Sequence, residues 1–117
     1  MDPDAIRDLF AGLGPVRVRR MFGGQGIYRD ELMFALEAGG ELFLKADAET
    51  AGAFAAAGSA QFVYEKDGRA TAMSYWRLPD PALDDPDEAG RWGRLALEAA
   101  RRAAAAKAKK PRRRPAG

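Results

Sequence analysis

The sequence contains no cysteine and no histidine among its 117 residues. Without cysteine the chain can form no disulfide, and it offers no thiolate nucleophile and no thiolate ligand for zinc. Without histidine it can build neither a Ser-His-Asp triad nor a histidine metal site. Carboxylates, lysine, arginine, tyrosine and the two serines, Ser59 and Ser74, are what remains for chemistry. Any enzymatic function would have to use these side chains. We expect a binding module and not an enzyme, with no metal and no organic cofactor.

Long hydrophobic runs are also missing from the sequence. No stretch approaches the roughly 18 consecutive apolar residues of a membrane-spanning helix. The chain starts with Met1-Asp2-Pro3-Asp4, which is acidic, whereas a signal peptide starts with positive charge. The length and the 47% of apolar residues are those of one globular domain. We therefore expect a cytoplasmic protein that does not contact a membrane.

The basic residues are unevenly distributed along the chain, although the formal net charge is only +2. Eight of the 19 basic residues follow Glu98, and no acidic residue follows it. The part up to Glu98 has 11 basic against 17 acidic residues, so it carries about −6 while the end carries +8. The composition predicts a globular domain over residues 1–102 and a basic tail over residues 103–117, which is rich in Ala, Pro, Lys and Arg.

The basic end is a candidate nucleic-acid contact. Lysine and arginine on an extended segment displace counterions from phosphates, and they attract a nucleic acid without recognising its sequence. The residues predicted to do so are Arg101, Arg102, Lys107, Lys109, Lys110, Arg112, Arg113 and Arg114. Alternatively, the tail rests on its own acidic domain, or it meets an acidic protein or membrane surface.

Hydrophobic periodicity predicts an α+β fold. Helical spacing begins after Asp2, alternation begins near Val16, and Asp85 followed by Pro86 is typical of a helix start. The expected helices cover about residues 3–12, residues 47–57 with Asp47 as their cap, and a segment from residue 86 that ends before Pro111. The expected strands cover residues 16–22, 27–28, 32–36, 42–45, 61–65 and 69–76. The order is helix, four strands, helix, two strands, helix, which predicts two layers, with helices packed on an antiparallel or mixed sheet.

The glycine-rich segment Gly23-Gly24-Gln25-Gly26 and the neighbouring Arg20 are candidate site features. A strand and not a helix is expected after these glycines, which favours a turn or bulge over a phosphate-binding loop. Strand alternation places Arg20 on the apolar face, where a cation requires a carboxylate from Glu65, Glu37 or Asp47, unless the strand bulges and Arg20 turns outward to a ligand. As a hypothesis, Arg20, Lys45 and Tyr75 line one groove.

Apolar residues fall on both registers of the expected strands, as Phe43 does between Leu42 and Leu44. The aromatic residues of the strands either pack in the core or offer surfaces on which bases stack. A sheet covered by helices on one face alone exposes an apolar patch, and such patches mark partners. The sequence therefore predicts a protein partner, of which a homodimer is the simplest.

The ten residues from Arg19 to Tyr28, RRMFGGQGIY, resemble the opening of the N-terminal domain of TfoX/Sxy proteins. Later segments agree in order and spacing: FAL at 34–36, LFLKAD at 42–47, FVY at 62–64, MSYW at 73–76, Leu78-Pro79 and the helix through Trp92. The resemblance covers about residues 5–102 and implies a two-layer α+β unit.

The TfoX/Sxy resemblance also implies a function. Proteins of this family regulate natural competence in bacteria together with a cyclic-AMP-responsive activator at promoters, and they carry a second, C-terminal domain where this chain has its basic tail. We therefore expect a small regulatory module with nucleic-acid contact through the tail. One alternative is a chaperone-like protein-interaction domain with a passive tail. The other is a small-molecule sensor or an enzyme whose pocket uses Arg20, Lys45 and Tyr75.

Overall fold

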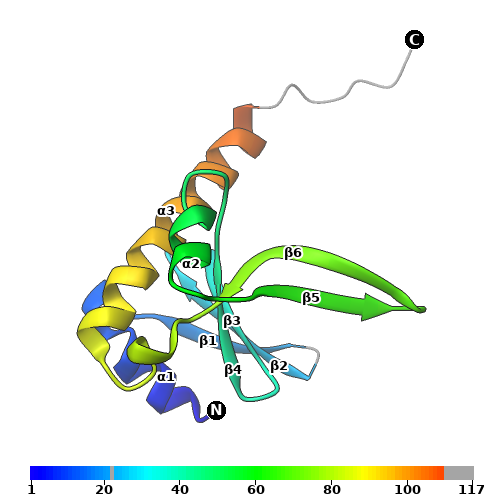
Figure 1. Ribbon diagram of the computed structural model, residues 1–117. Coiled ribbons are helices and arrows are strands. Elements are labelled where there is room, and N and C mark those ends of the chain that lie inside the picture. The colour runs from blue at the N-terminus through cyan, green and yellow to red at the C-terminus, as the bar shows by residue number, and fades with distance from the viewer. Residues whose placement is uncertain (22, 110–117) are drawn as a thin grey trace.

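The computed structural model describes residues 1–21 and 23–109, and it shows the predicted α+β class (Figure 1). The helices are α1 (Pro3–Leu9), α2 (Ala51–Ala56) and α3 (Pro86–Lys109), with short 3-10 turns at Ala11–Leu13 and Asp80–Ala82. The strands are β1 (Arg17–Met21), β2 (Gly24–Arg29), β3 (Leu32–Ala38), β4 (Glu41–Lys45), β5 (Gln61–Lys66) and β6 (Arg69–Arg77). Residue 22, which we expected in the first strand, lies outside the described residues.

The strands form one six-stranded sheet in the order β1-β2-β3-β4-β6-β5, with antiparallel pairing throughout. The first four strands form a meander, as their short connections predicted. The β5–β6 hairpin joins this meander through β6, which pairs with β4. Figure 1 shows the hairpin extending beyond the other strands, away from the helices. The edges of the sheet are therefore β1 and β5.

The helices cover one face of the sheet and close the hydrophobic core. The largest fully buried side chains come from all parts of the chain: Ile6, Phe10, Ile27, Phe34, Leu42, Leu44, Phe54 and Leu78. Phe10 from the end of α1 meets Phe34 of β3 edge to face, with the ring centroids 5.4 Å apart. Each such side chain stabilises the fold by roughly 1.5–3 kcal/mol. These contacts fix α1 and α3 on one side of the sheet.

A bulge in β3 explains why two neighbouring residues both reach the core. Ile27 pairs with Ala35 while Tyr28 pairs with Met33, so Phe34 is an extra residue on β3. Phe34 and Ala35 are both fully buried. Strict alternation would place these two side chains on opposite faces of the sheet. Because of the bulge, both point into the core instead.

The start of α2 differs from the prediction that Asp47 caps a helix over residues 47–57. The Asp47 carboxylate accepts hydrogen bonds from the backbone N–H groups of Glu49 and Thr50, at 3.0 and 3.2 Å. The Asp47 N–H in turn donates to Thr50 Oγ1 at 3.0 Å. These bonds close a turn over residues 47–50, and α2 begins only at Ala51.

The last helix, α3, starts at Pro86 as predicted and continues to Lys109. Asp85 lies before it, and its carboxylate accepts from the N–H groups of Asp87 and Glu88 at 3.0 and 3.3 Å. The predicted boundary between domain and tail, at residues 102 and 103, therefore falls inside a continuous helix. The first part of the tail is a projecting extension of α3 (Figure 1).

The glycine-rich segment serves as a turn, as predicted, and also as a place of close backbone approach. Gly23 has φ +66° in the turn between β1 and β2. Within β2, a Cβ atom on Gly24 would overlap the backbone oxygen of Glu37 on β3. A Cβ atom on Gly26 would lie 2.8 Å from Met21 Sδ and 2.9 Å from Met33 Sδ. Gly24 therefore has no room for a side chain, whereas at Gly26 the flexible methionine side chains would have to move.

We predict that Gly24→Ala destabilises the protein by about 1–3 kcal/mol, because the added methyl group displaces the β3 backbone. Gly12→Ala is the matched control, since a Cβ atom there meets nothing within 4 Å. Urea unfolding followed by circular dichroism measures both variants. Equal midpoints for the two variants would contradict the close approach of β2 and β3.

Candidate functional site

The face of the sheet opposite the helices carries many of the remaining apolar side chains. Cross-strand partners share a face. Ile27, Ala35, Leu44 and Trp76 form one row across β2, β3, β4 and β6, and all pack in or against the core. The adjacent row therefore points away from the helices, and it consists of Gly26, Leu36, Phe43 and Arg77. We call this side the open face.

A groove of about 310 Å³ lies on the open face between the β5–β6 hairpin and the first three strands. Its apolar lining comes from Met21, Leu36, Ala38, Phe62, Tyr64 and Met73. Tyr64 is 50% exposed, and Met21 and Met73 are each 37% exposed. The expected exposed apolar patch is thus present, and we call it the open-face groove.

Lys45 and Tyr75 lie together on the open face, where β4 pairs with β6. Lys45 Nζ is 5.4 Å from the centroid of the Tyr75 ring and donates a hydrogen bond of 3.0 Å to Ser74 Oγ. Burial, with a smaller effect of Tyr28, raises the pKa of Tyr75 to about 12. Tyr75 is buried, so most of its side chain contacts neighbouring residues and not solvent.

Arg20 lies apart from Lys45 and Tyr75. It is exposed and lines a cleft of about 510 Å³ with Met1, Pro3, Gln25 and Glu37, on the side of the sheet to which α1 belongs. Among the described residues it forms no ion pair with the three expected carboxylates. Neither expected alternative for Arg20 is found: β1 pairs with β2 without a bulge, so Arg20 stays on the same face as Val18, where it is exposed at the sheet edge. The structure brings together only two of the three residues that we expected in one groove.

Glu37 is a buried carboxylate that the sequence analysis considered only as a partner for Arg20. Burial opposes its ionisation, but hydrogen bonds from Gln25 and from the Gly40 N–H, together with the N-terminal ammonium, hold its pKa below the usual range. Gln25 Nε2 donates to Glu37 at 2.7 Å, and the Met1 ammonium lies 3.4 Å away. These donors satisfy the carboxylate without Arg20.

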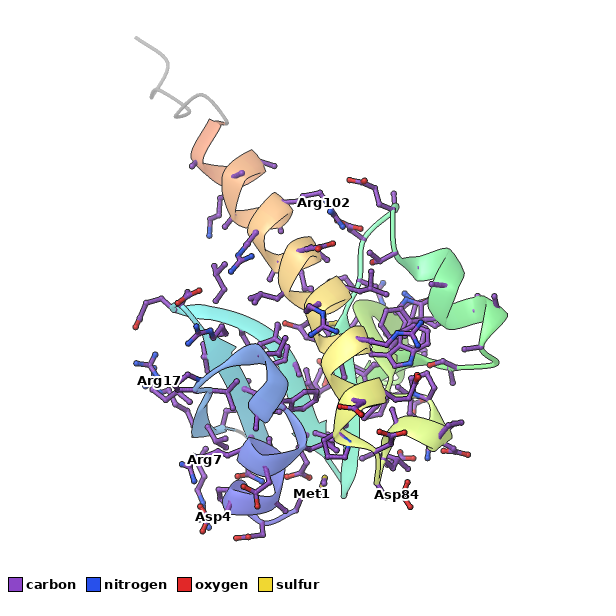
Figure 2. All side chains as sticks on the ribbon, turned by 90° about the vertical axis from the view of Figure 1, so that its left-hand side faces the viewer. Met1, Asp4, Arg7, Arg17, Asp84 and Arg102 are labelled. Carbon is purple, nitrogen blue, oxygen red and sulfur yellow. The ribbon has the colours of Figure 1, made fainter. Side chains whose placement is uncertain are left out.

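The first two of the predicted nucleic-acid contacts face acidic residues of their own domain. Arg101 Nη2 lies 3.4 Å from Asp30 Oδ2. Arg102 Nε lies 2.7 Å from Asp47 Oδ2 and 2.9 Å from Glu49 Oε2. Figure 2 shows Arg102 pointing from α3 toward the loop that leads into α2. We call Arg101, Arg102 and their three carboxylates the α3 anchor.

The remaining predicted contacts lie beyond the α3 anchor. Lys107 is exposed on the last turns of α3, and Lys109 is the final residue of that helix. Lys110, Arg112, Arg113 and Arg114 lie outside the described residues.

Neither a metal centre nor a membrane span is found in the described part of the chain. Over residues 1–21 and 23–109, no three acidic side chains are placed so that they could hold a metal ion. The helices in that part lack the combination of length and hydropathy that crossing a bilayer requires.

Comparison with known proteins identifies the family. The family model of the TfoX N-terminal domain matches residues 8–100, and the chain therefore belongs to the TfoX N-terminal domain family. Protein Sxy of Escherichia coli (strain K12) is 27% identical over 94 residues, which is 80% of this chain and 45% of Sxy. The chain thus spans less than half the length of that relative. The resemblance predicted from the sequence motifs is confirmed.

Sequence reasoning missed the methionines of the open-face groove. Met21 on β1 and Met73 on β6 are separated by three strands in the sheet order, and they line one groove because the hairpin lies beside the open face. Alternation in β6 could have indicated Met73, because residues two apart in a strand lie on the same face and Met73 is two residues before Tyr75.

We predict that the α3 anchor makes stability depend on pH. The hydrogen bond from Arg102, against a smaller effect of burial, lowers the pKa of Asp47. Its contribution is present above about pH 4, where an unfolded aspartate is ionised, and disappears as the pH falls through the lower folded value. Asp47→Asn should lower the thermal unfolding midpoint at neutral pH and flatten its decline below about pH 4.

Asp84→Asn is the matched control for Asp47→Asn. The exposed Asp84 carboxylate has no hydrogen bond or ion pair within the described residues. Thermal unfolding followed by circular dichroism over a pH series measures both variants. Identical pH profiles for the wild type and Asp47→Asn would rule out a stabilising role of the anchor.

Proposed function

We propose that this chain is a regulatory binding module of the TfoX/Sxy type and not an enzyme, and that its basic end contacts nucleic acid. Family membership supports the regulatory class. The α3 anchor is the main observation in support of the nucleic-acid contact. It holds α3 against the domain at Arg101 and Arg102, and the residues that follow are strongly basic. The regulator brings its folded domain to a nucleic acid by charge, while the domain supplies the contact with a protein.

The charge balance supports this division of roles. Residues 1–102 contain 13 basic and 17 acidic residues, a net charge of −4, and the six basic residues that follow have no acid among them. Arg101 and Arg102 are engaged with Asp30, Asp47 and Glu49. They therefore serve the folded domain, and the six residues beyond them are the contacts with phosphate.

The geometry of α3 favours contact at a distance from the domain. The side chains of residues 103–108 are all exposed, so this end of α3 is not packed against the sheet. A helix rises about 1.5 Å per residue, which carries the basic segment roughly 10 Å from the anchor before the described residues end. The acidic domain is thereby separated from the phosphates that the tail attracts.

The open-face groove supports the protein-interaction alternative. Methionine and aromatic side chains line it, and such surfaces accommodate apolar side chains of protein partners. Its lining is almost entirely apolar, which favours a protein over a polar small molecule. In this alternative the tail is passive, and the nucleic-acid experiment separates the two functions.

We predict that the full chain binds duplex DNA with little sequence preference and strong salt dependence. If all six basic residues beyond Arg102 engage phosphates, the slope of log K against log salt is about −5. A variant in which those six residues are replaced by glutamine should lose most of the binding and nearly all of the slope. Fluorescence anisotropy of a labelled duplex at several salt concentrations measures both quantities.

A variant with residues 103–117 in shuffled order is the matched control. It keeps every charge, and because phosphate contacts do not depend on residue order, its affinity should stay close to that of the wild type. Unchanged affinity of the glutamine variant would show that the tail is passive.

A further inference from the structure

The β5–β6 hairpin exposes apolar side chains on both of its faces. Phe62 and Tyr64 line the open-face groove, so Val63 between them points to the opposite side. Val63 is 51% exposed and Tyr64 is 50% exposed. The outer edge of β5 is one of the two ends of the sheet, and no strand of the described residues lies beside its backbone groups on that side. A two-stranded ribbon of this kind gains stability from a further strand.

The other sheet edge, β1, is protected against pairing with its own copy. Arginine stands at three of its five positions: Arg17, Arg19 and Arg20. In every antiparallel two-fold register that pairs three or more residues of β1, an arginine faces an arginine. Like charges directly opposite each other destabilise a strand pair. Natural sheets use charge in this way to prevent edge association.

The β5 edge has no such protection and matches itself in one register. With the two-fold axis at Val63, this residue faces its own copy, Phe62 faces Tyr64, and Gln61 faces Glu65. Apolar residues then meet apolar residues, aromatic rings meet aromatic rings, and no like charges are opposed. Moving the axis to Tyr64 places Val63 opposite Glu65, which removes this match.

The irregularity of the hairpin leaves the β5 edge intact. Between the pairs Gln61–Trp76 and Val63–Ala72, β5 advances two residues while β6 advances four. The extra residues therefore bulge from β6, on the side away from the free edge. Gln61 Nε2 donates a hydrogen bond of 2.8 Å to the Met73 carbonyl in this region. A regular outer edge is what strand addition requires.

We propose that a second copy of this chain pairs along β5, antiparallel and with the two-fold axis at Val63. The pairing joins two six-stranded sheets into one continuous sheet. It also places Tyr64 of the second copy beside Phe62, so that the two open-face grooves become neighbours across the axis. This interface does not involve the basic tail, and it is independent of the proposed nucleic-acid contact.

Sedimentation velocity of the full chain over a range of concentrations tests this interface. We expect a monomer–dimer equilibrium for the wild type. Val63→Lys places two lysines opposite each other at the axis and should raise the dissociation constant about tenfold or more. Ala72→Lys is the matched control, because Ala72 pairs with Val63 on the inner strand, is exposed, and does not reach the edge.

A charge pair at the axis gives a second, sharper test. Val63→Lys and Val63→Glu should each be monomeric alone, whereas an equimolar mixture should form a heterodimer, since residue 63 faces itself. Circular dichroism verifies that each variant is folded. A monomeric wild type at every concentration would overturn the proposal, and so would a dimer that both Val63 variants leave intact.

The lack of native cysteine provides a covalent readout that does not depend on the charge variants. In Val63→Cys the two thiols should lie within disulfide distance across the axis, so mild oxidation should produce a covalent dimer. In Ala72→Cys, oxidation should produce no covalent dimer. Equal cross-linking of the two variants would contradict the register, and cross-linking of an Arg19→Cys variant in place of Val63→Cys would put the interface at β1.

Discussion

One constraint underlies the structure: the helices cover only one face of the sheet. The covered face is closed by aromatic and aliphatic side chains such as Phe10, Phe34 and Phe54, which are fully buried. The opposite face has no second layer of helices within the described residues, although its strands carry apolar side chains there as well. The open-face groove and the exposed hairpin follow from this one-sided arrangement, and they are the surfaces on which we propose that a partner binds.

Charge divides the molecule along a different line. The folded domain is acidic, and the residues that continue α3 are basic. At the junction, Arg102 meets Asp47 and Glu49, and Arg101 meets Asp30. Opposite charges thus hold the start of the extension against the domain, while like charges accumulate beyond it. The two proposed contacts therefore rest on separate features, an apolar surface on the sheet and the basic residues that continue α3.

Local patterns in the sequence predicted the class and the element order, because periodicity and capping depend on neighbouring residues. Features that depend on distant residues were not predictable in this way. The bulge at Phe34 accompanies packing against the distant Phe10, and the late start of α2 results from the turn that Asp47 and Thr50 close. The site was predicted less well than the fold. Lys45 and Tyr75 meet, but Arg20 lies elsewhere because strand pairing decides which side chains share a surface.

Hydroxyl-radical footprinting of the dilute full chain tests the one-sided covering of the sheet most directly, because it reports the solvent exposure of individual side chains. The account predicts rapid modification of Met21 and Met73 in the open-face groove, and protection of Phe34 and Phe54 under the helices. Equal protection of all four side chains would show that the open face is covered, and it would contradict the arrangement on which the binding surfaces depend.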